Sequence, residues 1–164
     1  MDNDPKEKDE GNLVFRNATV NDLDFIIQAN NIINDNSNLK RMDEKLIKRL
    51  KQDFFPVNQT HSNAGIMIAD MDKKAIGMAI YSACYYAIEG DCMWLSNIYV
   101  DENYRGCGIA RKMIEQLKKI ARKNGYDSIS FLEDVTNEKA KKFAFKNNAK
   151  LSDNFRFFHI KLKP

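Results

Sequence analysis

The stretch that decides the fold is Arg105-Gly106-Cys107-Gly108-Ile109-Ala110. An apolar run, residues 93–100, precedes it, and a long amphipathic segment, residues 111–124, follows it. This order predicts a strand, a short glycine loop and a helix. Backbone N–H groups of such a loop and the unpaired donors of the helix start can face an anion, and the helix dipole favours the same charge. The stretch therefore predicts a phosphate-binding loop with Arg105 at its entrance.

Outward from this loop, the chain predicts an α/β fold. Apolar periodicity and turn residues indicate strands at 13–15, 66–69, 76–86, 93–100, 128–132 and 155–162. Helical spacing begins at Leu23 and is ended by the Asn-rich residues 34–38; further helices are expected at 43–53, 111–124 and 137–146. Residues 1–11 read as a mobile charged tail. Residues 12–164 are expected to form a single domain.

Composition excludes several classes of function. A formal net charge of +3 gives no reason to expect a nucleic-acid partner, although it favours a polyanionic small ligand. No apolar run is long enough to span a membrane, and no secretory signal follows Met1. Three cysteines without CxxC spacing and two histidines indicate a reducing compartment and no metal site. A cytoplasmic protein is expected.

Three kinds of phosphate loop compete for residues 105–110. A Walker A loop needs a Gly-Lys-Ser/Thr sequence that the chain lacks. A dinucleotide fingerprint needs a third glycine where Arg111 stands, and an arginine there opposes close packing of helix and strand. The third pattern is Gln/Arg-x-x-Gly-x-Gly/Ala, and Arg105, Gly108 and Ala110 match each of its defined positions.

That third pattern resembles the acetyl-coenzyme A loop of the GNAT superfamily of N-acetyltransferases. A second motif, Asn137-x-x-Ala140-x-x-Phe143, resembles a later helix of the same family, and the likeness extends over roughly residues 13–162. The resemblance implies a mixed, mostly antiparallel sheet flanked by helices, with its fourth and fifth strands splayed apart. It also implies acetyl-coenzyme A as the acyl donor.

The resemblance assigns cofactor-binding residues by position. Backbone groups of the fourth strand would pair with the pantetheine arm, and those of the loop would bind the pyrophosphate. Arg111 would face the phosphates, and two residues of the later helix would line the other side of the cofactor. The complete set is Ile98, Tyr99, Val100, Arg105, Gly106, Cys107, Gly108, Ile109, Ala110, Arg111, Asn137 and Phe143.

The residues expected to move protons are missing. Members of the family often carry a Glu on the fourth strand, where this chain has Ser96 or Asn97, and a Tyr after the Phe of the later helix, where it has Ala144. Three explanations stay open. A water held by Ser96 and Asn97 carries the proton, another carboxylate such as Glu133 or Asp91 replaces the missing one, or the domain binds coenzyme A without efficient transfer. The catalytic residues are left unknown.

The expected function is transfer of an acetyl group from acetyl-coenzyme A to a primary amine. The acceptor would be a small molecule, with polyamines or diamines favoured by the acidic Glu89 and Asp91, or a peptide amine. Dimers are common among proteins of this resemblance, so a homodimer is one expected assembly. The alternative is a non-catalytic acyl-coenzyme A-binding sensor or interaction module.

Overall fold

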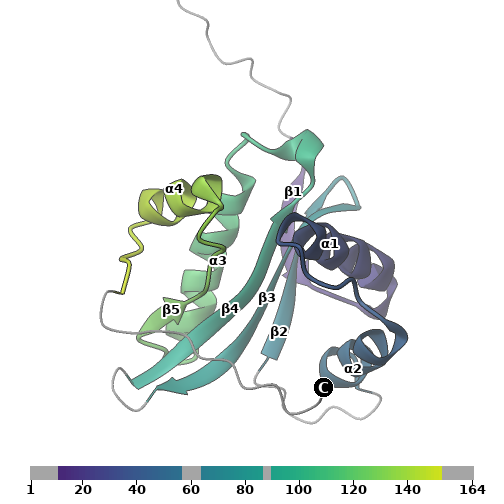
Figure 1. Cartoon of the computed structure of the whole chain (residues 1–164), viewed down its shortest axis with the longest axis horizontal. Helices are drawn as coiled ribbons and strands as arrows, with labels where there is room; N and C mark the ends of the chain where they lie inside the picture. Colours follow the sequence, from purple (N-terminus) through teal and green to yellow (C-terminus); the bar gives the residue numbers. More distant parts are fainter. Residues whose placement is uncertain (1–10, 57–63, 87–89, 153–164) are drawn as a thin grey trace, which may run out of the picture. The chain divides into compact units, whose positions relative to one another are not determined.

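A five-stranded sheet with strand order β1-β2-β3-β4-β5 organises the chain (Figure 1). The computed structural model describes residues 11–56, 64–86 and 90–152. Neighbouring strands are antiparallel except for β4 and β5, which are parallel. The strands are β1 (Leu13–Asn17), β2 (Ala64–Met71), β3 (Lys74–Tyr86), β4 (Gly90–Val100) and β5 (Ser128–Ser130). The predicted mixed, mostly antiparallel sheet is confirmed.

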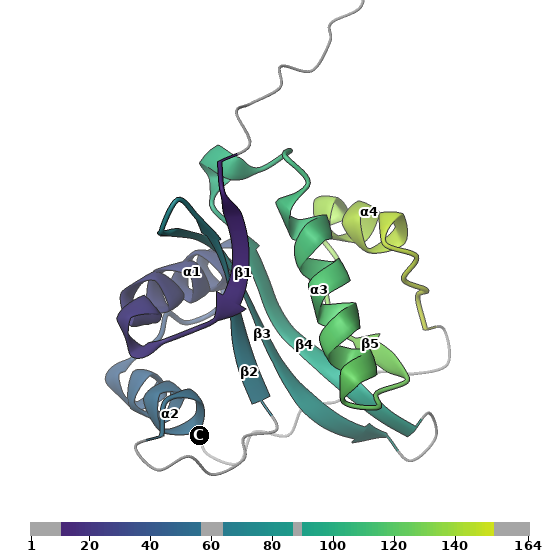
Figure 2. The same cartoon turned by 180° about the vertical axis from the view of Figure 1, so that it is seen from behind.

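Helices cover both faces of this sheet. The helices α1 (Leu23–Asn36) and α2 (Glu44–Phe54) lie on one face, and α3 (Ile109–Lys123) lies on the other (Figure 2). The buried core beneath α1 and α2 consists of Ile26, Ala29, Leu50, Ile66, Ile68 and Met78. On the opposite face, α3 packs against β3, β4 and β5 through a stripe of buried residues: Ile109, Met113, Ile114, Leu117 and Ala121. This apolar stripe at helical spacing fixes which side of α3 meets the sheet.

Local sequence sets the ends of these elements. Asp72 and Lys73 both have positive φ, at 52° and 67°, and form the two-residue turn that joins β2 to β3. The Asp43 side chain caps α2 by accepting the Leu46 N–H at 2.9 Å. Gly125, with φ of 76°, follows the end of α3, as expected of a helix stop.

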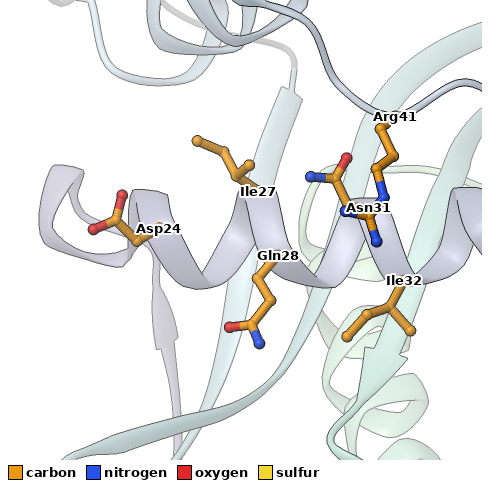
Figure 3. Close-up of a pocket in the computed structure, with 6 residues that line it drawn as sticks. All are labelled: Asp24, Ile27, Gln28, Asn31, Ile32 and Arg41. Atoms are coloured by element: carbon orange, nitrogen blue, oxygen red, sulfur yellow. The ribbon is translucent and has the colours of Figure 1, made fainter.

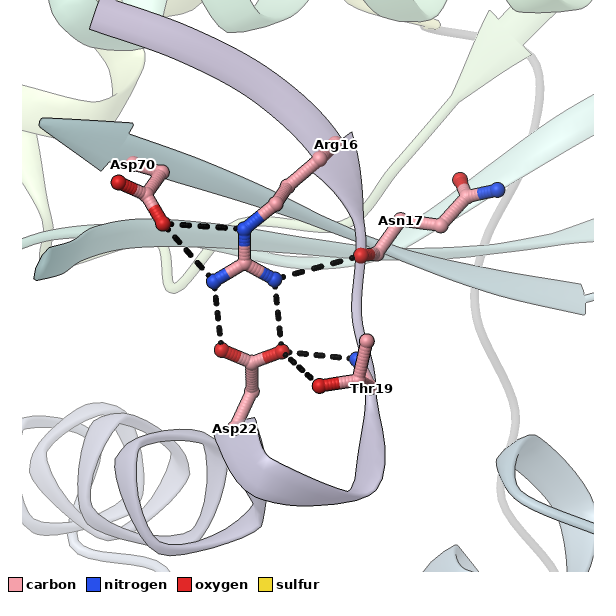
Figure 4. Close-up of polar contacts among 5 residues, drawn as sticks. All are labelled: Arg16, Asn17, Thr19, Asp22 and Asp70. Carbon is pink, nitrogen blue, oxygen red and sulfur yellow. Dashed lines mark hydrogen bonds and ion pairs between the residues drawn. The ribbon is translucent and has the colours of Figure 1, made fainter. Parts of the chain in front are cut away.

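A charge network fastens β1 to β2 and to the start of α1 (Figure 4). The Arg16 guanidinium donates to both oxygens of Asp22 at 2.8 Å, and it also lies 2.9 Å from Asp70. Asp22 accepts two further hydrogen bonds, from the Thr19 N–H at 2.7 Å and from its hydroxyl. Because hydrogen bonds from Arg16 stabilise the ionised form, the pKa of Asp22 falls to about 2.

The described residues group into two compact units, the first ending at Leu132 and the second beginning at Glu133. The second unit contains α4 (Glu138–Lys146), whose N-cap is Asn137. The Asn137 side chain accepts the Ala140 N–H at 3.0 Å, which satisfies one donor of the first helical turn. The predicted single domain over 12–164 stays a prediction.

Most predicted elements are confirmed, although several of their ends differ by a few residues from the prediction. α1 continues through the Asn-rich residues to Asn36, and the Asn34 side chain donates to the Lys40 carbonyl in the segment that follows. β5 ends at Ser130, two residues early. The tail at 1–10, the two histidines and the strand predicted at 155–162 lie outside the described residues. No helix in the described ranges is long and apolar enough to cross a membrane.

Candidate functional site

The glycine loop connects β4 to α3 by an unusual backbone path. A short 3-10 turn, η2 (Glu102–Tyr104), follows β4, and its start is capped by the Asp101 side chain, which accepts the Asn103 N–H. Gly106 and Gly108 then take positive φ values of 83° and 74°. Side chains with a Cβ rarely adopt these angles, so both positions favour glycine.

Successive backbone donors in this loop find no acceptor in the described segments. The Lys112 N–H, which donates to the Gly108 carbonyl at 3.0 Å, makes the first hydrogen bond of α3. Within the described part of the chain, no residue accepts from the backbone N–H groups of residues 106–111. Together with the positive end of the α3 dipole, these six donors form a site for an anion.

Space is available beside the loop for such an anion. A Cβ added to Gly106 or to Gly108 would meet no heavy atom within 4 Å. The glycines are therefore not required by crowding from the rest of the protein. Positive φ and open space together leave room for the phosphate groups of a nucleotide-bearing ligand to approach the backbone.

β4 and β5 separate just before this loop. Their parallel pairing joins Cys92, Met93 and Trp94 to Ser128, Ile129 and Ser130, and among the described residues β5 pairs with no later part of β4. The predicted splay of these two strands is thereby confirmed. Residues 95–100 of β4, apart from Ser96, pair with β3 on one side, and on the other side no described strand pairs with them; this side is called the free edge below.

The register shows which backbone groups lie along this free edge. The Asp101 N–H donates to the Ile76 carbonyl at 2.8 Å, which extends the β3–β4 ladder by one residue. Since Tyr99 stands opposite Met78 in the same ladder, alternation turns the backbone of Tyr99 toward β3. It turns the backbone groups of Ile98 and Val100 toward the free edge. Ile98 therefore directs its N–H and carbonyl toward this edge, where an extended ligand could pair with them, and Val100 directs its N–H there, since its carbonyl accepts from Arg105.

Arg105 ties the loop back to the end of β4. Its Nε donates to the Val100 carbonyl at 2.9 Å, and its guanidinium carbon lies 5.8 Å from the centre of the Tyr99 ring. The remaining guanidinium nitrogens have no partner among the described residues. Arg105 thus holds the loop in place and keeps positive charge beside it.

Two tyrosines near the loop have packing roles. The Tyr99 ring meets the Phe25 ring edge-on, with centroids 6.2 Å apart. Burial, together with the negative charge of Asp101, raises the pKa of the Tyr99 hydroxyl, so Tyr99 is protonated at neutral pH. The Tyr104 ring lies 5.8 Å beneath the Lys74 ammonium.

A β-bulge lies where β4 leaves β5. The register shifts between Ile80 and Tyr81, which leaves Ser96 as the extra residue of β4, and Ser96 is exposed. The next residue, Asn97, points toward α1, where its Nδ2 donates to Oδ1 of Asn30 at 2.5 Å. Bulges often re-aim side chains next to functional sites.

Asn30 is the residue that sequence reasoning missed. It is buried, and its own Nδ2 donates to the Ile26 carbonyl at 2.9 Å. The available signal was a single amide within the apolar stripe that α1 turns toward the sheet. Such a side chain needs a polar partner, and the sequence does not show that this partner lies 67 residues away.

The remaining candidates lie apart from the loop or in the second unit. Asp91 is exposed at the start of β4. Asn137 and Phe143 belong to the second unit, so their position beside a cofactor stays a prediction. Glu133 begins that unit, and its Oε2 atom is buried with no hydrogen-bond partner among the residues that the structure describes. Ala144 is buried and has no group that can transfer a proton.

A separate hollow of about 450 Å³ lies along the outward face of α1 (Figure 3). It is lined by Asp24, Ile27, Gln28, Asn31, Ile32 and Arg41. These α1 residues lie on the side of the helix away from the buried Ile26 and Ala29. Arg41 is already paired with Asp35 at 2.6 Å. The hollow is thus distinct from the loop and from the free edge of β4.

Comparisons with known proteins agree with this geometry. A model of the acetyltransferase (GNAT) family matches residues 31–147. A possible acetyltransferase from Clostridium difficile 630 superposes with a TM-score of 0.74 at 20% identity, over 91% of this chain and 98% of that one. None of the curated proteins compared matches the sequence.

Two aminoglycoside acetyltransferases share the fold. One, meta-AAC0020 from an uncultured soil metagenomic sample, was solved with sisomicin and gives a TM-score of 0.71 at 20% identity, over 92% and 97% of the two chains. The other, AAC(6')-Iy, was solved with coenzyme A and gives a TM-score of 0.72 at 14% identity, over 92% of this chain and 96% of that one. At these identities the likeness concerns the fold alone.

Proposed function

Because the chain belongs to the acetyltransferase (GNAT) family, we propose that it transfers an acetyl group from acetyl-coenzyme A to a primary amine. The observation that carries this proposal is the row of six backbone N–H groups at residues 106–111 for which the described part of the chain provides no acceptor. The loop follows β4, whose residues beyond Trp94 pair with no part of β5 in the described ranges. A pyrophosphate attached to an extended amide-bearing arm has the chemistry to fill both features.

The donor is held by backbone groups in this proposal. The pyrophosphate lies on the N–H groups of the loop, with Arg105 and Arg111 supplying positive charge. The pantetheine arm runs along β4 and pairs with the outward groups of Ile98 and Val100, with Tyr99 between them. The full proposed set also includes Gly106, Cys107, Gly108, Ile109, Ala110, Asn137 and Phe143.

The thioester supplies an activated acyl group. In the reaction the amine nitrogen forms a bond to the acyl carbon, the carbon–sulfur bond breaks, and the amine loses a proton while the thiolate gains one. An alkylammonium with a pKa near 10 is neutral in about one molecule in a thousand at pH 7. β4 carries no carboxylate from Cys92 to Val100. In this proposal, positioning of a neutral amine therefore contributes more to the rate of transfer than it would in an enzyme with a general base on that strand.

The acceptor is an amine of a small molecule, such as a polyamine, or of a peptide. We place the enzyme in the cytoplasm, since three cysteines without CxxC spacing fit a reducing compartment. A homodimer is the proposed assembly.

The experiment incubates the full chain with acetyl-coenzyme A and each of three amines: spermidine, sisomicin and an alanyl tetrapeptide. Release of free thiol is the readout, and acetyl-coenzyme A without amine is the control. We expect amine-dependent thiol release with at least one acceptor. Tight binding of acetyl-coenzyme A without such release would favour the alternative, an acyl-coenzyme A-binding sensor or interaction module.

A further inference from the structure

We propose that Asn97 binds the acceptor amine through its side-chain oxygen, and that the buried Asn30 is a positioning residue that turns this oxygen toward the acyl group. This inference rests on the proposed function and adds to it a named acceptor-binding residue. Four observations carry it: a fixed order of hydrogen bonds, an oxygen without a donor, the burial of Asn30, and the place of Asn97 on β4.

The order of hydrogen bonds fixes the orientation of both amides. The Ile26 carbonyl can only accept, so Asn30 must present Nδ2 to it, at 2.9 Å. Oδ1 of Asn30 then faces Asn97, which must present Nδ2 in turn, at 2.5 Å. Turning either amide over would set two acceptors or two donors against each other. Oδ1 of Asn97 is therefore directed away from Asn30.

Oδ1 of Asn97 accepts no hydrogen bond within the described ranges. Asn97 is half-buried, so a ligand can reach this oxygen. Asn30, by contrast, is 7% exposed and uses both ends of its amide. An amide held at one end by a buried partner loses little further freedom when a ligand binds at the other end. The pair thus presents a preorganised hydrogen-bond acceptor.

Asn97 lies where a thioester would end. In this proposal an extended arm starts at the loop and follows β4 from Val100. At about 3.3 Å per residue, the part of the arm between Val100 and Asn97 is about 10 Å long. Beyond this point β5 rejoins β4 at Trp94 and closes the edge. The bulge at Ser96 marks the same place. An arm lying along the free edge therefore brings its acyl end next to Asn97.

The chemistry of an amide suits a neutral amine. An amine N–H donates to Oδ1 of Asn97, and this hydrogen bond directs the nitrogen lone pair toward the acyl carbon. The amide does not accept the proton that the amine later loses. Asn97 therefore acts by orientation, an effect that depends on ångström-scale placement of the reacting atoms.

The test measures acetyl transfer by Asn97→Ala with spermidine, sisomicin and the alanyl tetrapeptide in turn. For each acceptor that the wild-type protein uses, we expect kcat/KM to fall about 10- to 100-fold. The Kd of acetyl-coenzyme A in calorimetry should stay within about 2-fold, since backbone groups hold the donor in this proposal and the Asn97 side chain makes no hydrogen bond to it. An unchanged kcat/KM would overturn the inference.

A double-mutant cycle separates positioning from a structural role. Asn30→Ala should lower kcat/KM about 10-fold, and the double variant should be no slower than Asn97→Ala alone, because Asn30 acts only through Asn97. Effects that multiply would overturn its positioning role. If Asn30→Ala does not fold, as judged by thermal melting, Asn97→Ala alone decides the acceptor-binding claim.

Asn31→Ala is the matched control. Asn31 is the neighbouring residue of α1, is half-buried, and binds the Met42 N–H at 2.8 Å, facing the outer hollow (Figure 3). It should change the melting temperature without changing kcat/KM. Failure of the proposed function looks different: the wild-type protein would then release no thiol with any of the three amines, which removes the basis of this inference as well.

Discussion

The Arg16 network and the glycine loop use polar groups in opposite ways. In the network, one guanidinium meets two carboxylates, and Asp22 accepts from Arg16 and from Thr19 (Figure 4). In the loop, six consecutive N–H groups have no acceptor among the described residues. Satisfied buried polar groups hold a fold together, whereas unsatisfied donors on an open surface are available to a ligand. Stability and binding are thus assigned to different residues.

The largest expected effect is on binding, from Gly108→Glu. The variant forces a side chain into positive φ and puts a carboxylate where the phosphates would lie. The Kd of coenzyme A in calorimetry should rise at least about 100-fold, because a charge-assisted contact becomes a repulsion. The matched control is Gly125→Glu, whose φ of 76° is nearly the same at the other end of α3. It should lose similar stability and keep its affinity; equal loss of binding in both variants would refute the loop assignment.

The second effect is on stability, from Arg16→Met. Removing the guanidinium leaves the carboxylates of Asp22 and Asp70, which are 8% and 12% exposed, without their cation. We expect the free energy of unfolding to fall by about 3 kcal/mol in urea titrations, at the low end for a broken buried pair because Arg16 itself is partly exposed. Arg49→Met, which breaks an exposed pair with Asp53, should cost about 0.5 kcal/mol or less. A change in coenzyme A affinity in Arg16→Met would contradict the separation of roles.

Acid should weaken the Arg16 network, because Asp22 must be protonated. The pKa of Asp22 is about 2 in the folded protein, below the usual 3.8. The stability from this shift is therefore complete above about pH 5 and is lost as the pH falls toward 2. It amounts to about 2 kcal/mol, and about half is lost by pH 3. Urea titrations at pH 7 and pH 3 should show a smaller acid loss for Asp22→Asn than for the wild-type protein; equal losses would show that Asp22 does not carry this dependence.

The smallest effect is expected from Arg105, which has one satisfied hydrogen-bond donor, as in the Arg16 network, and other donors available to a ligand, as in the loop. Its Nε donates to the Val100 carbonyl, while its outer nitrogens have no hydrogen-bond partner in the described ranges. Arg105→Met should therefore weaken coenzyme A binding about 10-fold, or about 1.4 kcal/mol, with little loss of stability. Arg111→Met removes an exposed charge from the first turn of α3 and should weaken coenzyme A binding less than Arg105→Met does. A larger effect at Arg111 would mean that charge near the helix matters more than the anchored arginine.

Sequence patterns predicted the loop and most elements because their signals are local. Glycines at 106 and 108 and the stripe from Ile109 to Leu117 each lie within a few residues of one another. The bulge at Ser96 and the pairing of Asn97 with Asn30 depend on strand register and on contacts between distant segments, which spacing does not encode.

The most direct test of the central claim is an amide NMR titration of the full chain with coenzyme A. If the loop donors bind the pyrophosphate, the N–H resonances of residues 106–111 should shift most, followed by those of Ile98 and Val100. The Thr19 N–H, which already donates to Asp22, should barely move. Saturable binding that shifts resonances elsewhere while residues 106–111 stay unchanged would contradict the account.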